Sequence, residues 1–195
     1  MKAYDVLGLT SEADLDKLYN LAKAVPENGI IVEVGSLFGR TAVALAEGAV
    51  SSTKIYCIDY FDEFINDHFA GQSFYNTGPQ WEVGKIYNRK DEFQKYTKEY
   101  ANIIPLQLSS RTSSIYHPYK GEPIDLFFLD ASHKNPSDIM NIMYFRTFLK
   151  PNAVICGHDY ALMFPDVIKN VKFLEQLYKT PVIRYANSSM WAIRT

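Results

Sequence analysis

The chain has 195 residues, of which 47% are hydrophobic and 14% aromatic, enough for one domain with a sizeable buried core. The formal net charge is −2 and the basic residues are scattered, which gives no reason to expect nucleic acid or an anionic membrane as a partner. We therefore predict a single domain over residues 1–195 that binds neither of them.

The cysteines and the start of the chain indicate its compartment. Cys57 and Cys156 each stand inside an apolar run, which is typical of buried reduced thiols rather than of a disulfide framework. The first residues lack the pattern of a signal peptide, and no apolar run approaches the roughly 20 residues needed to span a bilayer. A cytoplasmic location is the expectation that follows.

Helices and strands alternate along most of the chain. The first helix is predicted to begin at Ser11, because Asp14 follows at the spacing of a capping signal, and to end near Pro26. Short apolar runs bounded by turn residues indicate the strands. The predicted strands are residues 30–34, 54–59, 102–108, 124–130, 153–159, 181–185 and 188–194. The later helices are predicted at residues 39–48, about 91–100, 137–149 and about 165–178.

This alternation favours a parallel sheet covered by helices on both faces. Ala186-Asn187 is typical of a hairpin turn, so the last strand should run antiparallel to its neighbours. We predict a Rossmann-like three-layer α/β/α sandwich whose seven-stranded sheet is mostly parallel and ends in an antiparallel C-terminal hairpin. Ligands bind beyond the carboxyl ends of such strands, where polar residues of this chain gather. These residues are Glu33, Asp59, Ser109, Asp130, His158 and Asp159.

The stretch from Glu33 to Gly39 combines an acid, two glycines and a helix start. Gly35 and Gly39 allow a tight turn and the close approach of a ligand, and the helix start offers free N–H groups. A dinucleotide-binding loop would have another glycine at position 37, where this chain has Leu37. An acid on the strand suits a ligand with an ammonium group, such as the methionine end of S-adenosylmethionine. A tight turn without any ligand is the alternative.

At this point the chain resembles the class I S-adenosylmethionine-dependent methyltransferases. VEVGSLFGRTAVALAEGA is similar to the first motif of the catechol and caffeoyl-CoA O-methyltransferases. LFFLDASHKNPSDIMNIMYFRTFLKPNAVICGHDY resembles bacterial methyltransferase family 24, which is related to cephalosporin-hydroxylase-like and macrolide-sugar O-methyltransferase proteins. The resemblance covers residues 28–59 and 103–195 and leaves out the segment between them.

The resemblance implies S-adenosylmethionine as the cofactor. Asp59 matches the acid that binds both ribose hydroxyls, although a solvated carboxylate at a strand end is the simpler alternative. Ser110 and Arg111 follow the third strand, where the family places residues around the adenine, and an arginine there is as often a surface residue. The positions that match the methionine-binding loop are Glu33, Gly35, Ser36 and Gly39.

Methyl transfer from a sulfonium needs an electron-rich acceptor atom close to the methyl carbon. A hydroxyl attacks well only after it loses its proton, either to a base or under the influence of a metal. In the catechol-type enzymes an aspartate ends the fourth strand and a lysine three positions later is the base. Here Asp130 is followed at that spacing by His133, whose imidazole titrates near neutral pH. A histidine that only caps a helix or orders the loop is the alternative.

A divalent metal is a second implication of the resemblance. In the metal-dependent relatives, the aspartate of the fourth strand and two adjacent residues after the fifth hold Mg²⁺. This chain has Asp130, His158 and Asp159 at those positions. A histidine suits Mn, Fe, Ni or Zn better than Mg²⁺, so both the identity and the use of a metal stay open.

Residues 60–100 lie outside the resemblance and are rich in aromatic residues. Long irregular segments are often functional, so we predict an inserted lid or acceptor-binding segment. A contact in a homodimer or a subsidiary core is the alternative. The aromatic residues in question are Phe61, Phe64, Phe69, Phe74, Tyr75 and Trp81.

These features predict methyl transfer from S-adenosylmethionine to a hydroxyl of a small polar metabolite or sugar, with or without help from a divalent metal. Two other functions stay open. An NAD(P) oxidoreductase would share the sheet topology, and a non-catalytic S-adenosylmethionine-binding module would keep the loop at Gly35–Gly39 without needing His133.

Overall fold

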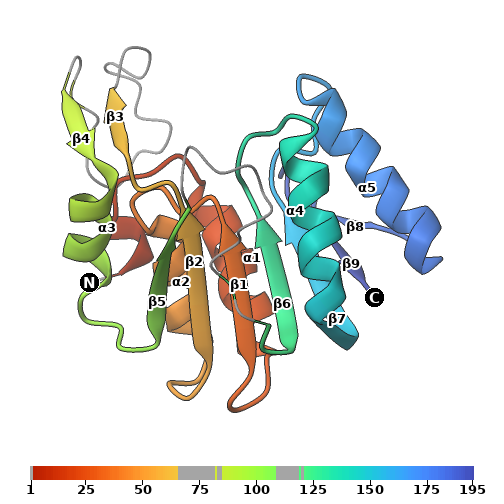
Figure 1. Cartoon of the computed structure of the whole chain (residues 1–195), viewed down its shortest axis with the longest axis horizontal. Helices are drawn as coiled ribbons and strands as arrows, with labels where there is room; N and C mark the ends of the chain where they lie inside the picture. Colours follow the sequence, from red (N-terminus) through yellow and green to blue (C-terminus); the bar gives the residue numbers. More distant parts are fainter. Residues whose placement is uncertain (1, 66–81, 83–84, 109–118, 120) are drawn as a thin grey trace.

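The computed structural model describes residues 2–65, 82, 85–108, 119 and 121–195 (Figure 1). Within them, one seven-stranded sheet has the order β5-β2-β1-β6-β7-β9-β8. Its strands are β1 (Ile30–Val34), β2 (Lys54–Asp59), β5 (Ile103–Gln107), β6 (Ile124–Leu129), β7 (Leu149–Gly157), β8 (Ile183–Arg184) and β9 (Trp191–Arg194). The first five of these pair in parallel, whereas β9 runs antiparallel to β7 and β8. The predicted sheet is therefore confirmed, including its antiparallel end.

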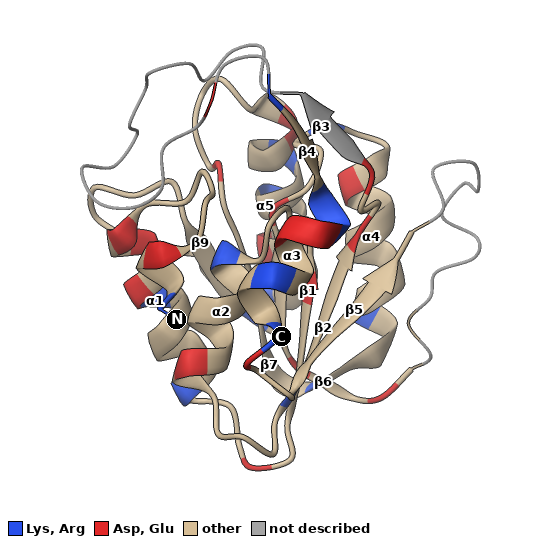
Figure 2. Cartoon of the chain, turned by 90° about the vertical axis from the view of Figure 1, so that its left-hand side faces the viewer, with Lys and Arg blue, Asp and Glu red and all other residues tan. Residues whose placement is uncertain are grey.

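Helices cover both faces of the sheet. One layer contains α1 (Glu12–Lys23), α2 (Arg40–Gly48) and α3 (Arg89–Thr97), and the other contains α4 (Ser137–Phe145) and α5 (Pro165–Tyr178). Figure 2 shows α1 and α2 on one side of the strands and α4 on the other. Three layers result, as the sequence predicts. No helix among the described residues is long and apolar enough to cross a membrane.

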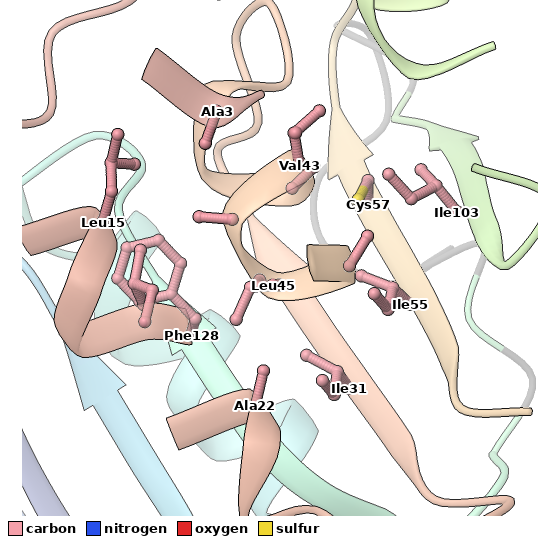
Figure 3. Packing of buried hydrophobic residues seen from close by; sticks show 14 of the residues in the cluster. Ala3, Leu15, Ala22, Ile31, Val43, Leu45, Ile55, Cys57, Ile103 and Phe128 are labelled. Carbon is pink, nitrogen blue, oxygen red and sulfur yellow. The ribbon is translucent and has the colours of Figure 1, made fainter. Parts of the chain in front are cut away.

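Two hydrophobic clusters join the layers, one on each face of the sheet. The cluster beneath α1 and α2 contains Leu15, Leu45 and Ile31 (Figure 3). Val32, which follows Ile31 in β1, belongs to the opposite cluster, and the side chains of Ile31 and Val32 are both fully buried. Because successive side chains of a strand point to opposite faces, a strand covered on both sides is mostly apolar, and Glu33 is the exception in β1. This explains the apolar runs in the sequence.

Several boundaries differ from the prediction. The helix predicted to reach residue 149 ends at Phe145, and a 3₁₀ turn over Arg146–Phe148 leads into β7. β7 thus begins at Leu149 rather than at residue 153, with a register shift against β6. Asn152 has a φ of 63°, so it supplies the left-handed residue that such an irregularity requires.

The C-terminal hairpin has a longer loop than predicted. Only Ile183–Arg184 of the strand predicted over residues 181–185 is extended and paired. The connection to β9 includes Ser188 and Ser189, which were predicted to be part of the last strand. As a result, these two hydroxyls are free of the sheet and lie near the carboxyl end of β7.

The segment over residues 60–100 begins and ends with regular structure. β3 (Glu63–Ile65) and β4 (Ile86–Asn88) form a separate antiparallel pair, and α3 follows directly. Phe61 is buried and packs edge-on against Phe93 of α3, with 5.0 Å between ring centroids. Phe61 therefore belongs to the core. Phe64 lies in β3, whereas the other aromatic residues predicted for a lid lie outside the described residues, and the role of the segment stays a prediction.

Candidate active site

The parallel strands end at the top of Figure 1. Residues at these strand ends line a cavity of about 840 Å³. Small-molecule sites have volumes of roughly 300–1,000 Å³, so this cavity is of the size of a small-molecule site. Its wall combines the N-terminal segment Leu7–Thr10 with the ends of β1, β2, β6 and β7. The predicted site residues that line it are Gly35, Ser36, Asp59, Asp130, His133, His158 and Asp159.

The other predicted cofactor-binding residues do not line the cavity or lie outside the described residues. Glu33 is fully buried inside β1, and Gly39 lies behind the loop at the start of α2. Ser110 and Arg111 belong to the part of the chain that the structure leaves undescribed. The predicted adenine contacts therefore stay a prediction.

Glu33 supports the loop from inside the sheet. Its Oε2 accepts a 2.5 Å hydrogen bond from Ser36 Oγ, so the serine hydroxyl points inward. Burial raises the pKa of Glu33 to about 7, because the hydrogen bond from Ser36 only partly offsets the cost of a buried charge. Glu33 thus holds Ser36 and the loop from behind and does not itself line the cavity.

The two glycines of the loop are required by the packing of the chain itself. Gly35 has a φ of 94°, and a Cβ built there would lie 1.9 Å from the carbonyl oxygen of Asp130. Gly39 has a φ of 89°, and its Cβ would lie 2.8 Å from Thr97 Cγ2. Between them Leu37 also has a positive φ, 48°, at the position where a dinucleotide loop has glycine. The space next to both glycines is therefore occupied by protein.

Asp59 joins three segments at the edge of the cavity. Its Oδ2 accepts a 2.8 Å hydrogen bond from the N–H of Leu37, and its Oδ1 accepts from the N–H of Phe61 at 3.3 Å. Arg89 Nη1, at the start of α3, also lies 3.3 Å from Oδ1. An ionised carboxylate offers about four acceptor sites, so a ligand hydroxyl can bind in addition to these donors.

A cluster of three side chains lies in the wall of the cavity: Asp130, His133 and Asp159. His133 Nε2 lies 2.9 Å from Asp130 Oδ1 and 3.1 Å from Asp159 Oδ2. One ligand atom from each residue falls within 4.8 Å of the others, and all three side chains are half-buried. The ring of Phe164 packs on the imidazole, with 5.0 Å between centroids. The three side chains thus converge on one point in the cavity wall.

The electrostatics of the cluster favour a positive charge at that point. Burial lowers the pKa of His133, but the hydrogen bond and charge of Asp130, together with the charge of Asp159, outweigh burial and raise it. His133 and Asp159 both have left-handed backbones, with φ of 58° and 59°. Such conformations cost energy in non-glycine residues and are enriched at functional sites.

His158 contacts this cluster through Asp159 and contacts α1 on its other side. Its Nε2 lies 3.2 Å from Oδ2 of Asp14 in α1, and its Nδ1 lies 3.2 Å from Oδ1 of Asp159. Burial lowers the pKa of His158, but the hydrogen bonds with these two carboxylates outweigh it and raise the pKa to about 10. The sequence predicted His158 as a third metal ligand, whereas the structure groups His133 with the two aspartates.

Other residues of the site gave no recognisable signal in the sequence. Arg40 of α2 donates from Nε to the carbonyl of Thr10 at 3.0 Å and from Nη1 to that of Tyr4 at 3.3 Å. These bonds hold the N-terminal segment against the cavity. Arg89 and Asp14 contact site residues that are far away in the sequence, so no local motif marks them.

Solved structures with a similar fold include methyltransferases. A Staphylococcus aureus protein described as a caffeoyl-CoA O-methyltransferase has a TM-score of 0.63 at 10% identity, with 96% of this chain and 85% of that chain covered. A Bacillus cereus O-methyltransferase in complex with SAH has a TM-score of 0.61 at 16% identity, covering 99% and 86%. A Streptococcus thermophilus rRNA methylase has a TM-score of 0.59 at 13% identity, covering 96% and 97%. The fold is therefore that of the class I methyltransferases.

The sequence identifies the family more narrowly. Residues 32–160 match methyltransferase family 24, a methyltransferase domain, over more than half of the chain. The chain belongs to this family and is an S-adenosylmethionine-dependent methyltransferase. No curated protein matches the sequence significantly. The family match favours methyl transfer over the NAD(P) oxidoreductase alternative.

Proposed function

We propose that this protein transfers the methyl group of S-adenosylmethionine to a hydroxyl of a small polar metabolite or sugar, at a site with a divalent cation. The observation that carries the proposal is the cluster of Asp130, His133 and Asp159 in the wall of the cavity. It provides a place where a hydroxyl can lose its proton next to the space for the cofactor.

The cofactor lies, in this proposal, over the loop that follows β1. The backbone of Gly35 and Ser36 contacts the methionine end, and Asp59 accepts a hydrogen bond from a ribose hydroxyl. Glu33 and Gly39 shape the loop from behind, since neither lines the cavity. The orientation of Asp59 is already fixed by the N–H of Leu37 in this loop and by the N–H of Phe61 after β2.

The cluster has the right donor chemistry for a divalent cation. Two carboxylates and one imidazole within 4.8 Å resemble the mixed oxygen and nitrogen ligand sets that bind Mn²⁺, Fe²⁺ or Zn²⁺. The two aspartates supply the negative charge, and His133 Nε2 already lies between them. We therefore assign Asp130, His133 and Asp159 as ligands, in place of the predicted set with His158.

A bound divalent cation would lower the pKa of a coordinated hydroxyl and make it a better nucleophile at neutral pH. The residues of the chain then have separate tasks. Asp130 and Asp159 orient the acceptor towards the sulfonium, and His133 serves as a ligand rather than as the predicted free base. Phe164 shields the imidazole on one side and reduces the access of water.

The acceptor is assigned from the cavity rather than from the fold. Similar folds occur in proteins described as a caffeoyl-CoA O-methyltransferase and as an rRNA methylase, so the fold does not select the acceptor. The cavity, in contrast, is of the size of small-molecule sites. Tyr60, Asp62 and Arg89 from the segment over residues 60–100 contribute to its wall. We propose that this segment contacts the acceptor.

The direct test is transfer of a radiolabelled methyl group from S-adenosylmethionine to a panel of sugars, catechols and hydroxy acids. With Mn²⁺ or Mg²⁺ present we expect label in a methyl ether, and a chelator should abolish the transfer until metal is restored. Transfer that is insensitive to the chelator would remove the cation from the proposal. Cofactor binding without transfer to any acceptor would favour the non-catalytic module.

A further inference from the structure

A chain of alternating carboxylates and imidazoles runs from α1 to the cluster. Asp14 Oδ2 lies 3.2 Å from His158 Nε2, and His158 Nδ1 lies 3.2 Å from Asp159 Oδ1. The other oxygen of Asp159, Oδ2, lies 3.1 Å from His133 Nε2. Asp159 therefore uses one oxygen for His158 and turns the other towards the cluster that contains Asp130.

Asp14 is a fixed starting point for this chain. It is 5% exposed and accepts hydrogen bonds from Ser188 Oγ at 2.5 Å and from Ser11 Oγ at 2.7 Å. Lys17 Nζ lies 3.0 Å from Oδ1 of Asp14, the oxygen that also accepts from Ser188. Two segments far apart in the sequence, α1 and the loop before β9, thus hold the same carboxylate. A group held by this many donors has little freedom to reorient.

His158 transmits that order to Asp159. Both of its ring nitrogens face a carboxylate, so the plane of the imidazole is set from two sides. Ser189 Oγ lies 3.3 Å from His158 Nε2 and accepts a 3.3 Å hydrogen bond from the N–H of Asp159. A carboxylate on a short side chain rotates easily, and the contact between His158 Nδ1 and Asp159 Oδ1 restrains this rotation while Oδ2 faces the cluster.

We propose that Asp14 is a positioning residue for the cation site, which fixes the Asp159 carboxylate through His158 without touching the cation. This inference rests on the proposed function, because it needs a cation at Asp130, His133 and Asp159. Residues that orient metal ligands commonly change metal affinity by about 10–100-fold when they are removed. A purely structural role for Asp14, as part of the capped start of α1, would leave that affinity unchanged.

The experiment measures Mn²⁺ binding to the full chain by electron paramagnetic resonance of the free ion. We compare the wild type with Asp14→Asn, His158→Gln and the double variant, and use Asp16→Asn as the matched control. Asp16 lies on the same helix but is exposed and accepts a hydrogen bond from Tyr4 instead. S-adenosylhomocysteine affinity reports whether each variant keeps its cofactor pocket.

Asp14→Asn and His158→Gln should each weaken Mn²⁺ binding by about 10–100-fold, with Asp16→Asn and cofactor affinity unchanged. If Asp14 acts through His158, the double variant should be no weaker than the weaker single variant, because coupled residues are not additive. Should Asp14→Asn fail to fold, His158→Gln leaves the cap of α1 intact and still tests the contact with Asp159.

Two results would overturn the inference, and they can be told apart. The first is that Asp130→Asn loses Mn²⁺ while Asp14→Asn keeps the wild-type affinity, or that the losses of Asp14→Asn and His158→Gln add fully in the double variant. Asp14 then does not position Asp159 through His158, and the proposed function stands. If the wild type itself binds no Mn²⁺, the cation site of the proposed function fails and the inference fails with it.

Discussion

Replacing Asp130 by asparagine should reduce methyl transfer by about a thousandfold or more and leave the affinity for S-adenosylhomocysteine nearly unchanged. A metal ion contributes several kcal/mol to a transition state, and each 1.36 kcal/mol is a factor of about ten in rate. Asparagine has the shape of aspartate but lacks its negative charge. The cluster would then keep only the charge of Asp159 beside His133.

The fold should tolerate this change. The backbone of Asp130 makes the contacts that the sheet needs, since its N–H donates to the carbonyl of Val34 at 2.9 Å and its carbonyl packs on Gly35. Initial rates with radiolabelled cofactor and calorimetric titration with S-adenosylhomocysteine separate the two effects, and Asp16→Asn is the control for loss of an acid. Transfer within tenfold of the wild type would show that Asp130 is not part of the reacting site.

The variant Gly35→Ala is expected to lose more than about 4 kcal/mol of unfolding free energy, a loss that few single substitutions cause. Its φ of 94° is unfavourable for alanine, and the new Cβ would lie 1.9 Å from the carbonyl oxygen of Asp130. That oxygen belongs to the backbone at the end of β6, so relieving the clash would separate β1 from β6.

Gly121→Ala is the matched control for this prediction. Gly121 has nearly the same φ, 95°, but the nearest atom to its Cβ is Phe148 Cε1 at 2.8 Å, on a side chain that can move. Urea denaturation should therefore show a much smaller loss for Gly121→Ala, about 1–2 kcal/mol for the left-handed backbone. Equal losses in the two variants would mean that β6 does not restrict Gly35.

The buried strands of the sheet were predictable because their neighbours on both faces demand apolar residues. β1 and β2 have the predicted bounds, and each ends at the cavity. The start of β7 was missed because Pro151 and Asn152 suggest a turn, whereas the strand accommodates them in an irregular register beside β6. A local pattern cannot reveal this register, since the partner strand supplies it.

The candidate site was predictable in its members but not in its contacts. Acids after parallel strands must meet at one edge of the sheet, and this places Asp130 next to Asp159. His133 lies between them, whereas His158 also contacts Asp14, which lies 144 residues before it in the sequence. The sequence motif explained Asp14 as part of a helix cap, which it is, and gave no sign of its second contact.

Calorimetric titration of the wild-type chain with S-adenosylhomocysteine tests the central claim most directly. The account predicts one site per chain with a Kd on the order of 1–10 µM, and at least tenfold weaker binding in Asp59→Ala, because this carboxylate would receive a ribose hydroxyl. Absence of binding to the wild type, or equal affinity in Asp59→Ala, would contradict the assignment of the cavity to the cofactor.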